Sequence, residues 1–212
     1  MKQPFQRFRG IAAPLPLADI NTDAIIPSVF LRSEGADLAR GLFGRWRFDE
    51  EGEELDFVLN RLPFRRAEIL LAGENFGCGS SREAAAWALQ RFGIRCVVAP
   101  SFADIFYENA FRNGLLAAIV TPADLAAMVA AVEAYPDDAF LDVDLLSQTL
   151  TRGNDLRVSF TVPEFRRDAL LRGDDDIATT LRHGADIAAF AATEQSRHAW
   201  LHRAIAGQDG SR

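Results

Sequence analysis

The spacing of apolar positions changes twice along the chain and divides it into three regions. In the first region, up to about Leu62, short apolar runs are interrupted by prolines and glycines. This pattern is typical of strands and irregular loops rather than long helices. The central region runs from about Ala67 to Pro136, and a third pattern follows it.

The central region alternates between apolar strands and amphipathic helices. Strands are predicted at 67–72, 96–99 and 115–120, and helices at 81–92, 103–112 and from Pro122 onward. Gly93 is a C-cap for the first helix, and Thr121 is an N-cap for the last, with Pro122 in its first position. This alternation predicts an α/β fold, with a mostly parallel sheet, right-handed crossovers and flanking helices.

The third region changes from strands to helices. Strands are predicted at 141–144, 149–151 and 156–162, the last two joined by a turn at Gly153-Asn154. Helical segments follow from Glu164, and we expect Gly173 and Gly184 to end them. The alanine-rich apolar stretch from Ile187 predicts one more packed helix.

Length and composition limit the number of domains. With 212 residues, of which 49% are hydrophobic, the chain can bury one core and shows no need for a second. We therefore expect an α/β domain over residues 1–163. Residues 164–212 are expected to form a C-terminal helical extension of the same domain.

Charge and hydropathy narrow the possible partners. The net charge of -7 at pH 7 offers no basic excess for phosphate groups, which argues against a nucleic-acid partner. The apolar runs are too short to span a bilayer, and the first residues do not resemble a secretory signal. We expect a cytoplasmic protein without a membrane partner.

Several residue types that carry chemistry are scarce. Lys2 is the only lysine, which argues against Schiff-base chemistry and a P-loop. The three histidines, at 183, 198 and 202, all lie near the C-terminus. Cys78 and Cys96 are too few for an all-cysteine iron–sulfur cluster. We expect no metal site and no cofactor in this chain, so a metal-dependent reaction would need a second polypeptide.

The segment Gly77 to Glu83 is the main candidate for chemistry. It reads Gly-Cys-Gly-Ser-Ser-Arg-Glu and follows a predicted strand where a helix begins, an edge at which ligands bind in parallel sheets. Gly77 and Gly79 allow close approach of the backbone, the helix N-terminus attracts negative charge, and Arg82 offers a planar fork. These features predict a site for a carboxylate or a small phosphate.

A purely structural interpretation of this segment remains open. Ser80 and Glu83 fit the Ser-x-x-Glu capping box, in which Ser80 would only begin the helix. Cys78, taken alone, is more often a small buried apolar residue than a reactive thiol.

The same segment also carries a family resemblance. The residues from Gly73 to Glu83, reading Gly-Glu-Asn-Phe-Gly-Cys-Gly-Ser-Ser-Arg-Glu, resemble the signature of the swivelling domain of the aconitase superfamily. They are most similar to the family of 3-isopropylmalate dehydratase small subunits. Further blocks that resemble the family occur in the family's order over about 10–190. One lies upstream at 21–27, and the others lie downstream at 101–109, 113–116, 165–167 and 175–177.

The resemblance implies a fold and a division of labour between two subunits. The fold would be a swivelling-domain α/β sheet, and the family's large subunit would carry a [4Fe-4S] cluster that acts as a Lewis acid. This chain would join it in a heterodimer or a larger assembly and act as a hydro-lyase only there. The reaction would interconvert 2- and 3-isopropylmalate by dehydration and rehydration, in leucine biosynthesis.

The resemblance also implies roles for individual residues. Ser80 would be the general base. Ser81, Arg82 and Gly79 would hold a substrate carboxylate, and Asp23 would support the site. The side chain of the substrate would be selected by a loop that contains Val29, Phe30, Leu31 and Arg32.

This sequence departs from the family pattern at several positions. Ala84 and Ala86 stand where histidine and proline are common, Asn21 replaces the first aspartate of Asp-Thr-Asp, and Glu164 replaces a proline. Ser80 to Arg82 are intact, so the reaction type is expected to persist while the substrate stays open. The alternatives are a related hydro-lyase for a methylmalate, homoaconitate or aryl-substituted malate, and a non-catalytic module that binds anions.

Overall fold

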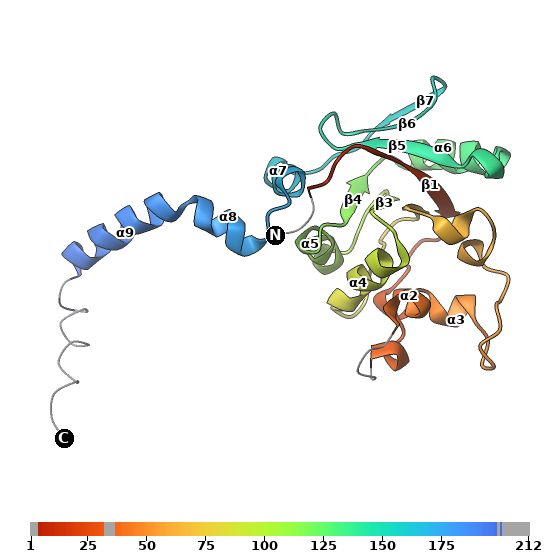
Figure 1. Ribbon diagram of the computed structural model, residues 1–212, viewed down its shortest axis with the longest axis horizontal. Helices are drawn as coiled ribbons and strands as arrows, with labels where there is room; N and C mark the ends of the chain where they lie inside the picture. The colour runs from red at the N-terminus through yellow and green to blue at the C-terminus, as the bar shows by residue number, and fades with distance from the viewer. Residues whose placement is uncertain (1–3, 32–36, 199, 201–212) are drawn as a thin grey trace. The chain divides into compact units, whose positions relative to one another are not determined.

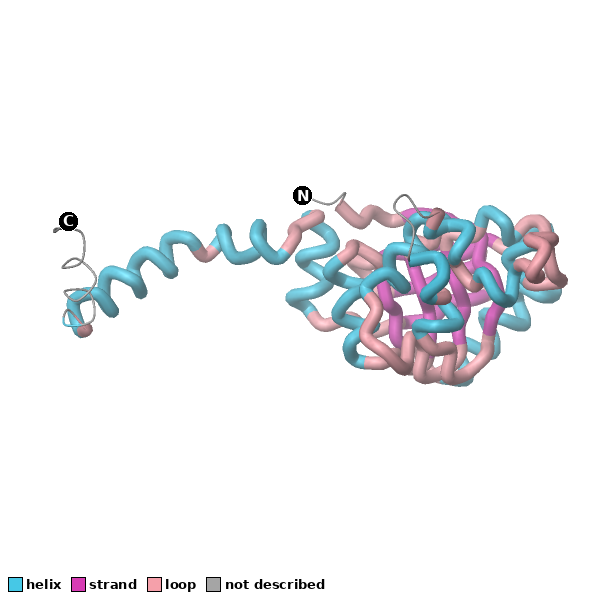
Figure 2. The backbone as a smooth tube through the Cα atoms, turned by 90° about the horizontal axis from the view of Figure 1, so that it is seen from below, coloured by secondary structure: helices cyan, strands magenta, loops and turns pink. Residues whose placement is uncertain are grey.

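A computed structural model describes residues 4–31, 37–198 and 200 (Figures 1 and 2). The chain forms two compact units that divide after Gly173. The first unit contains the sheet and the helices up to α7, and the second contains α8 and α9. The expected boundary at residue 164 stays a prediction. None of the described helices is both long and apolar enough to cross a membrane.

A mixed seven-stranded sheet with the order β4-β3-β2-β1-β5-β6-β7 forms the centre of the first unit. Four strands pair in parallel: β1 (Phe8–Leu15), β2 (Ile69–Ala72), β3 (Cys96–Ala99) and β4 (Leu116–Ile119). Three more continue from β1 in antiparallel pairing: β5 (Phe140–Asp144), β6 (Thr149–Arg152) and β7 (Leu156–Ser159). The expected α/β class is confirmed, and the sheet consists of a parallel half and an antiparallel half.

Helices cover both faces of the parallel half (Figure 1). The helix α4 (Glu83–Phe92) packs against α5 (Asp104–Arg112), whereas α6 (Pro122–Ala134) contacts β1, β2 and β3. Gly93 ends α4 with a φ of 121°, and the Thr121 side chain caps α6 by accepting a hydrogen bond from the Asp124 backbone N–H. Both predicted caps are confirmed.

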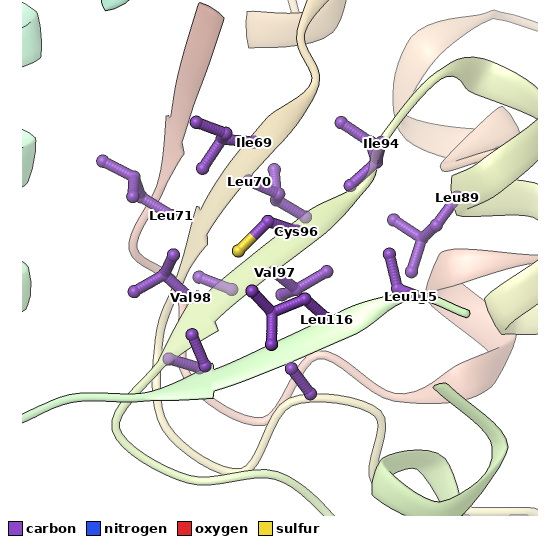
Figure 3. Close-up of a cluster of buried hydrophobic side chains, with 14 of the residues drawn as sticks. Ile69, Leu70, Leu71, Leu89, Ile94, Cys96, Val97, Val98, Leu115 and Leu116 are labelled. Carbon is purple, nitrogen blue, oxygen red and sulfur yellow. The ribbon is translucent and has the colours of Figure 1, made fainter. Parts of the chain in front are cut away.

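The core lies where these helices meet the parallel strands (Figure 3). Every residue of β2 and β3 is buried, as expected for strands with both faces covered. Leu89 of α4 joins this cluster together with Ile94 and Leu116. Burial of each such leucine or isoleucine contributes about 1.5–3 kcal/mol, which stabilises the edge on which the candidate site lies.

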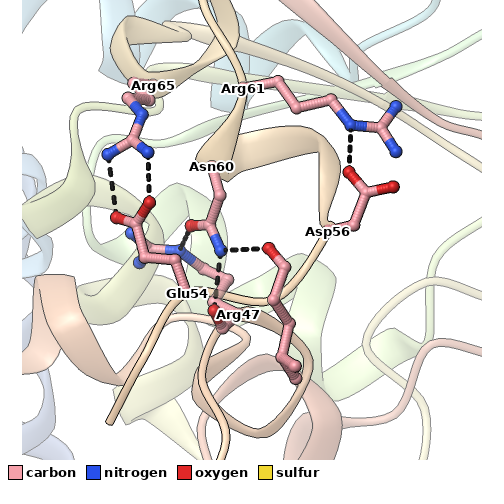
Figure 4. Close-up of polar contacts among 7 residues, drawn as sticks. Arg47, Glu54, Asp56, Asn60, Arg61 and Arg65 are labelled. Atoms are coloured by element: carbon pink, nitrogen blue, oxygen red, sulfur yellow. Dashed lines mark hydrogen bonds and ion pairs between the residues drawn. The ribbon is translucent and has the colours of Figure 1, made fainter.

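Short helices connect β1 to β2. They are α1 (Thr22–Ile25), η1 (Ser28–Leu31), α2 (Leu38–Gly41), α3 (Gly44–Arg47), η2 (Val58–Asn60) and η3 (Phe64–Arg66). Within the described part of this segment no helix is longer than four residues, as expected. The side chain of Arg47 is buried and donates to the Asn60 side chain in a polar cluster (Figure 4). It also donates to the backbone carbonyls of Ala39 and Leu42. Burial lowers the pKa of Arg47.

The last helices only partly follow the prediction. Helix α7 (Glu164–Arg172) ends at Gly173 in the left-handed conformation, as expected. Gly184 was expected to end a helix, but α8 (Asp176–Arg182) ends at His183 and Gly184 begins α9 (Gly184–Arg197). The helix expected from Ile187 is present within α9, which has no buried residue in the second unit, and its expected packing stays a prediction. Its apolar positions follow helical spacing but remain exposed.

Candidate functional site

Three loops come together at the carboxyl edge of the parallel half. They follow β1, β2 and β3, and backbone hydrogen bonds join each loop to the next. Gly77 N–H donates to the Ile20 carbonyl over 2.7 Å, and Thr22 N–H donates to the Cys78 carbonyl over 2.9 Å. Ala103 N–H donates to the Phe76 carbonyl over 3.0 Å. The loop that contains Ser80 is therefore held between its two neighbours.

Two residues with left-handed backbones stabilise this junction. Asp19 has a φ of 57° and Asn75 a φ of 55°, and the Asn75 Nδ2 donates to the Asp19 Oδ1 over 2.7 Å. Asparagine and aspartate tolerate this conformation better than other side chains. Their residue types were a usable signal for left-handed turns, but their pairing across 56 positions was not visible in the sequence.

Gly77 fits against an aromatic cluster below the loop. Its φ is 80°, and a Cβ atom at this position would lie 2.2 Å from Cγ of Phe106. The Phe106 ring also packs edge-on against Phe76, with a centroid distance of 5.1 Å. Gly77 was predicted to let the backbone approach a ligand, and the structure shows a different reason for glycine here, namely close packing on Phe106. A residue with a Cβ atom would push the loop away from α5.

The loop and the start of α5 enclose a cavity of about 240 Å³. Its lining consists of Thr22, Gly77, the four residues 79–82 and the four residues 103–106. Ser80 and Ser81 are exposed, and Arg82 is half-buried. The structure therefore brings together the predicted Gly79, Ser80, Ser81 and Arg82. It adds Thr22 and the segment 103–106, which the sequence analysis placed in the family's blocks at 21–27 and 101–109 but did not assign to the site.

Ser80 does not cap the helix. Helix α4 begins at Glu83, and its N-cap residue is Arg82, which makes no side-chain capping bond. The Ser80 carbonyl instead accepts a 2.7 Å hydrogen bond from the Thr22 hydroxyl, and the Glu83 carboxylate accepts from the Asn113 side chain. The capping-box interpretation and the predicted helix start at residue 81 are wrong. Within the described residues, the hydroxyls of Ser80 and Ser81 make no hydrogen bond.

Arg82 is held by the segment that follows β1. Its Nη1 lies 2.5 Å from Oδ1 of Asp23 and 3.3 Å from the carbonyl oxygen of Ile26. Asp23 was predicted to support the site, and it does contact Arg82, although it does not line the cavity. The guanidinium and the amino end of α4 favour negative charge in the cavity, and Asp23 offsets part of this potential.

The predicted selecting loop coincides with η1. Val29 and Leu31 are exposed, whereas Phe30 is partly buried against the core. None of these three residues lines the cavity. Ile26, whose carbonyl oxygen accepts a hydrogen bond from Arg82, lies just before η1 in the chain. Arg32 lies outside the described residues. The part played by this loop stays a prediction.

The donor groups of the chain do not suit a metal cluster. Among the described residues, no group of three histidine, cysteine, aspartate or glutamate side chains is close enough to hold a metal ion. Cys96 is buried within β3, where burial raises the pKa of its thiol, and Cys78 lies in the loop with its Sγ 3.4 Å from the Asp19 carbonyl oxygen. The two cysteines thus belong to different environments and offer no shared ligand set.

Comparison with known proteins shows the family to which the chain belongs. The profile of the aconitase C-terminal domain family matches residues 2–122. A 3-isopropylmalate dehydratase small subunit from Caulobacter vibrioides (strain NA1000 / CB15N) is 47% identical over 199 residues, which cover 93% of this chain and 98% of the relative. The small subunit of the same name from Jannaschia sp. (strain CCS1) is also 47% identical, with the same coverage of both chains.

A solved structure gives the same result. The crystal structure of 3-isopropylmalate dehydratase from Methanocaldococcus jannaschii matches with a TM-score of 0.61 at 28% identity, covering 86% of this chain and 98% of that chain. The resemblance carried by the blocks around Ser80 is thereby confirmed. The chain belongs to the family of 3-isopropylmalate dehydratase small subunits, within the aconitase C-terminal domain family.

Proposed function

We propose that this chain is the small subunit of a hydro-lyase that interconverts 2- and 3-isopropylmalate in leucine biosynthesis. One observation carries the proposal beyond family membership. Two serine hydroxyls that make no hydrogen bond to any described residue share a cavity with an arginine at the amino end of a ten-residue helix. This combination suits a dicarboxylate whose acidic C–H bond must be broken.

Ser80 is proposed as the general base. A neutral hydroxyl is a poor base, so it must lose its own proton before it can accept one from the carbon next to the carboxylate. The positive potential of Arg82 and of the α4 amino end favours the alkoxide. The electron pair left on carbon then forms the alkene as the hydroxyl on the neighbouring carbon departs as hydroxide, which becomes water by taking up a proton from solvent, to which Ser80 had first released its own. In the reverse direction, the Ser80 hydroxyl returns the proton.

Ser81, Arg82 and Gly79 are proposed to bind a substrate carboxylate. Guanidinium groups bind carboxylates through two parallel hydrogen bonds, and Arg82 has N–H groups beyond the one that contacts Asp23 and Ile26. Gly79, with a φ of 84°, presents its backbone without a side chain in the way. Asp23 is proposed to orient Arg82 rather than to contact substrate.

The large subunit is proposed to supply the [4Fe-4S] cluster that acts as the Lewis acid. The family resemblance assigns the [4Fe-4S] cluster to that subunit, and the described donor groups here do not fit a cluster. The exposed position of Ser80 and Ser81 suits a site that a second polypeptide completes. A cytoplasmic location, expected from the sequence, belongs to the same proposal.

The departures from the family pattern leave the substrate as the open part of the proposal. Asn21 caps α1 by accepting a 2.8 Å hydrogen bond from Ala24 N–H, a bond that an aspartate would also accept. Ala84 is buried in the first turn of α4, where the more common histidine would require more space. A related hydro-lyase that acts on another 2-substituted malate therefore remains the second candidate.

Reconstitution tests the proposal. The chain would be purified alone, then combined with a cluster-bearing large subunit encoded in the same genome. Alkene formation would be measured at the ultraviolet absorbance of the product. We expect no turnover by the chain alone and turnover of isopropylmalate by the mixture, at a higher kcat/KM than for methylmalate or an aryl-substituted malate. Full activity of the chain by itself contradicts the proposal, and a preference for another malate favours the second candidate.

A further inference from the structure

The aromatic residue of η1 lies on a surface made of two glycines. A Cβ atom built on Gly44 would lie 2.5 Å from Cε2 and 2.8 Å from Cζ of Phe30. A Cβ atom on Gly41 would lie 2.9 Å from Cβ of Phe30 and 2.6 Å from Cδ1 of Ile26. The Phe30 ring therefore packs directly on the backbone of α2 and α3, at a distance that only glycine permits.

This glycine surface is itself held firmly. Phe43, between the two helices, donates its N–H to the Ile25 carbonyl over 2.8 Å. Arg47 at the end of α3 donates to the carbonyls of Ala39 and Leu42, and its Nε donates to Asn60 Oδ1 over 3.0 Å (Figure 4). The surface under Phe30 is thus fixed on both sides. A change in its shape must displace the ring.

Hydrogen bonds connect the segment that contains Phe30 to Arg82. Ile26, whose carbonyl accepts from Arg82 Nη1 over 3.3 Å, precedes Pro27, and the Pro27 carbonyl accepts from Phe30 N–H over 3.0 Å. Val29 and Leu31 flank Phe30 and are 52% and 39% exposed, so their side chains are available to a ligand or a partner. A displacement of Phe30 would move these two apolar side chains relative to Arg82.

We propose that Gly41 and Gly44 are positioning residues for substrate selectivity. By seating Phe30, they set the distance between Arg82, which holds the carboxylate, and the exposed side chains of Val29 and Leu31, which meet the alkyl group of the malate. Phe30 is then an anchor for the loop and not a substrate contact. This inference rests on the proposed function and adds the structural element that sets the accepted size of the alkyl group.

The test uses the reconstituted two-subunit enzyme and the ratio of kcat/KM for isopropylmalate to that for methylmalate. Both kcat/KM values are proportional to the concentration of active enzyme, so this concentration cancels in their ratio. A variant that is only partly folded therefore gives the same ratio. Gly44→Ala is expected to lower the ratio about tenfold, the lower end of the about 10- to 200-fold discrimination that one methylene group gives in a hydrophobic pocket. A second substitution, Phe30→Leu in the Gly44→Ala background, is expected to restore the ratio in part by removing the ring.

The matched control is Gly184→Ala, because no described atom lies within 4 Å of the Cβ position there. Its ratio should equal that of the unsubstituted enzyme. If Gly44→Ala fails to assemble, Phe30→Leu alone should still shift the ratio, since the anchor is weakened. A ratio within twofold of the unsubstituted value in the Phe30 and Gly44 variants overturns the inference. An unsubstituted complex that turns over neither malate rejects the proposed function itself, which is a separate outcome.

Discussion

The two halves of the sheet use their polar side chains differently. In the antiparallel half, the polar side chains of the turn between β5 and β6 form hydrogen bonds within the turn. Asp144 Oδ1 accepts from the N–H groups of Leu146 and Ser147, and Ser147 Oγ lies 2.8 Å from Thr149 Oγ1. In the parallel half, the loop after β2 is held through backbone atoms, through Thr22 and through the side-chain hydrogen bond between Asn75 and Asp19, and the hydroxyls of Ser80 and Ser81 make no bond within the described chain.

This difference indicates where reactivity can reside. A side chain that completes a turn is committed to stability, whereas a side chain on a loop fixed by other groups is free for a ligand. The parallel half obtains such a loop by joining three loops at one edge and by accepting left-handed backbones at Asp19, Asn75, Gly77 and Gly79.

The largest expected effect on stability comes from comparing one glycine of each half. Gly77→Ala should lower the free energy of unfolding by about 3–5 kcal/mol, because the added Cβ meets the Phe106 ring and the positive φ is unfavourable. Gly153→Ala keeps the unfavourable φ of 55°, but no described atom lies within 4 Å of its Cβ position, so about 1–2 kcal/mol is expected. Urea unfolding measures both. Equal losses would contradict the tight seating of the loop.

A smaller effect on stability is expected from removing one hydrogen bond in each half, and the two variants should differ in turnover. Thr22→Val removes the hydrogen bond to the Ser80 carbonyl, and Ser147→Ala removes the bond to Thr149. Each should lower the free energy of unfolding by about 1 kcal/mol. Only Thr22→Val should lower the kcat of the two-subunit enzyme, by about tenfold, because a displaced base is less effective. A similar loss of kcat in both variants would remove the distinction between the halves.

The smallest effect concerns pH in the antiparallel half. Hydrogen bonding from the Ser147 N–H lowers the pKa of Asp144, so the carboxylate favours the folded state above its unfolded pKa of about 3.9. This contribution is lost as the pH falls through the folded-state pKa. Asp144→Asn should therefore flatten the acid side of the stability curve, measured by thermal unfolding between pH 2 and 6, and leave kcat unchanged. An unchanged acid slope would contradict this assignment.

The sequence predicted correctly those features that depend on residues close together in the chain. The apolar run Cys96–Ala99 matches β3 residue for residue, and Thr121 caps α6 as expected, because both depend on neighbouring residues. Ser80, Ser81 and Arg82 were recognised together for the same reason.

Contacts between distant segments account for what was missed or wrong. The Thr22 hydroxyl reaches across 58 positions to the Ser80 carbonyl, and α4 begins at Glu83 rather than near Ser80. The seating of Phe30 on Gly41 and Gly44 also depends on tertiary packing, and no periodicity in the sequence encodes it. A motif could therefore identify residues that line the cavity, whereas the contacts that hold their loop follow from the fold.

The central claim is that the Ser80 hydroxyl is kept free for catalysis, and Ser80→Ala tests it most directly. The variant would be combined with the large subunit, and its kcat, thermal unfolding and complex formation would be measured on one preparation. Loss of a general base should lower kcat by about 10²- to 10⁴-fold. The unfolding temperature and the assembly should stay unchanged, because the hydroxyl makes no bond within the described chain. A kcat near that of the unsubstituted enzyme, or a loss of stability that accounts for the lost activity, would contradict the account.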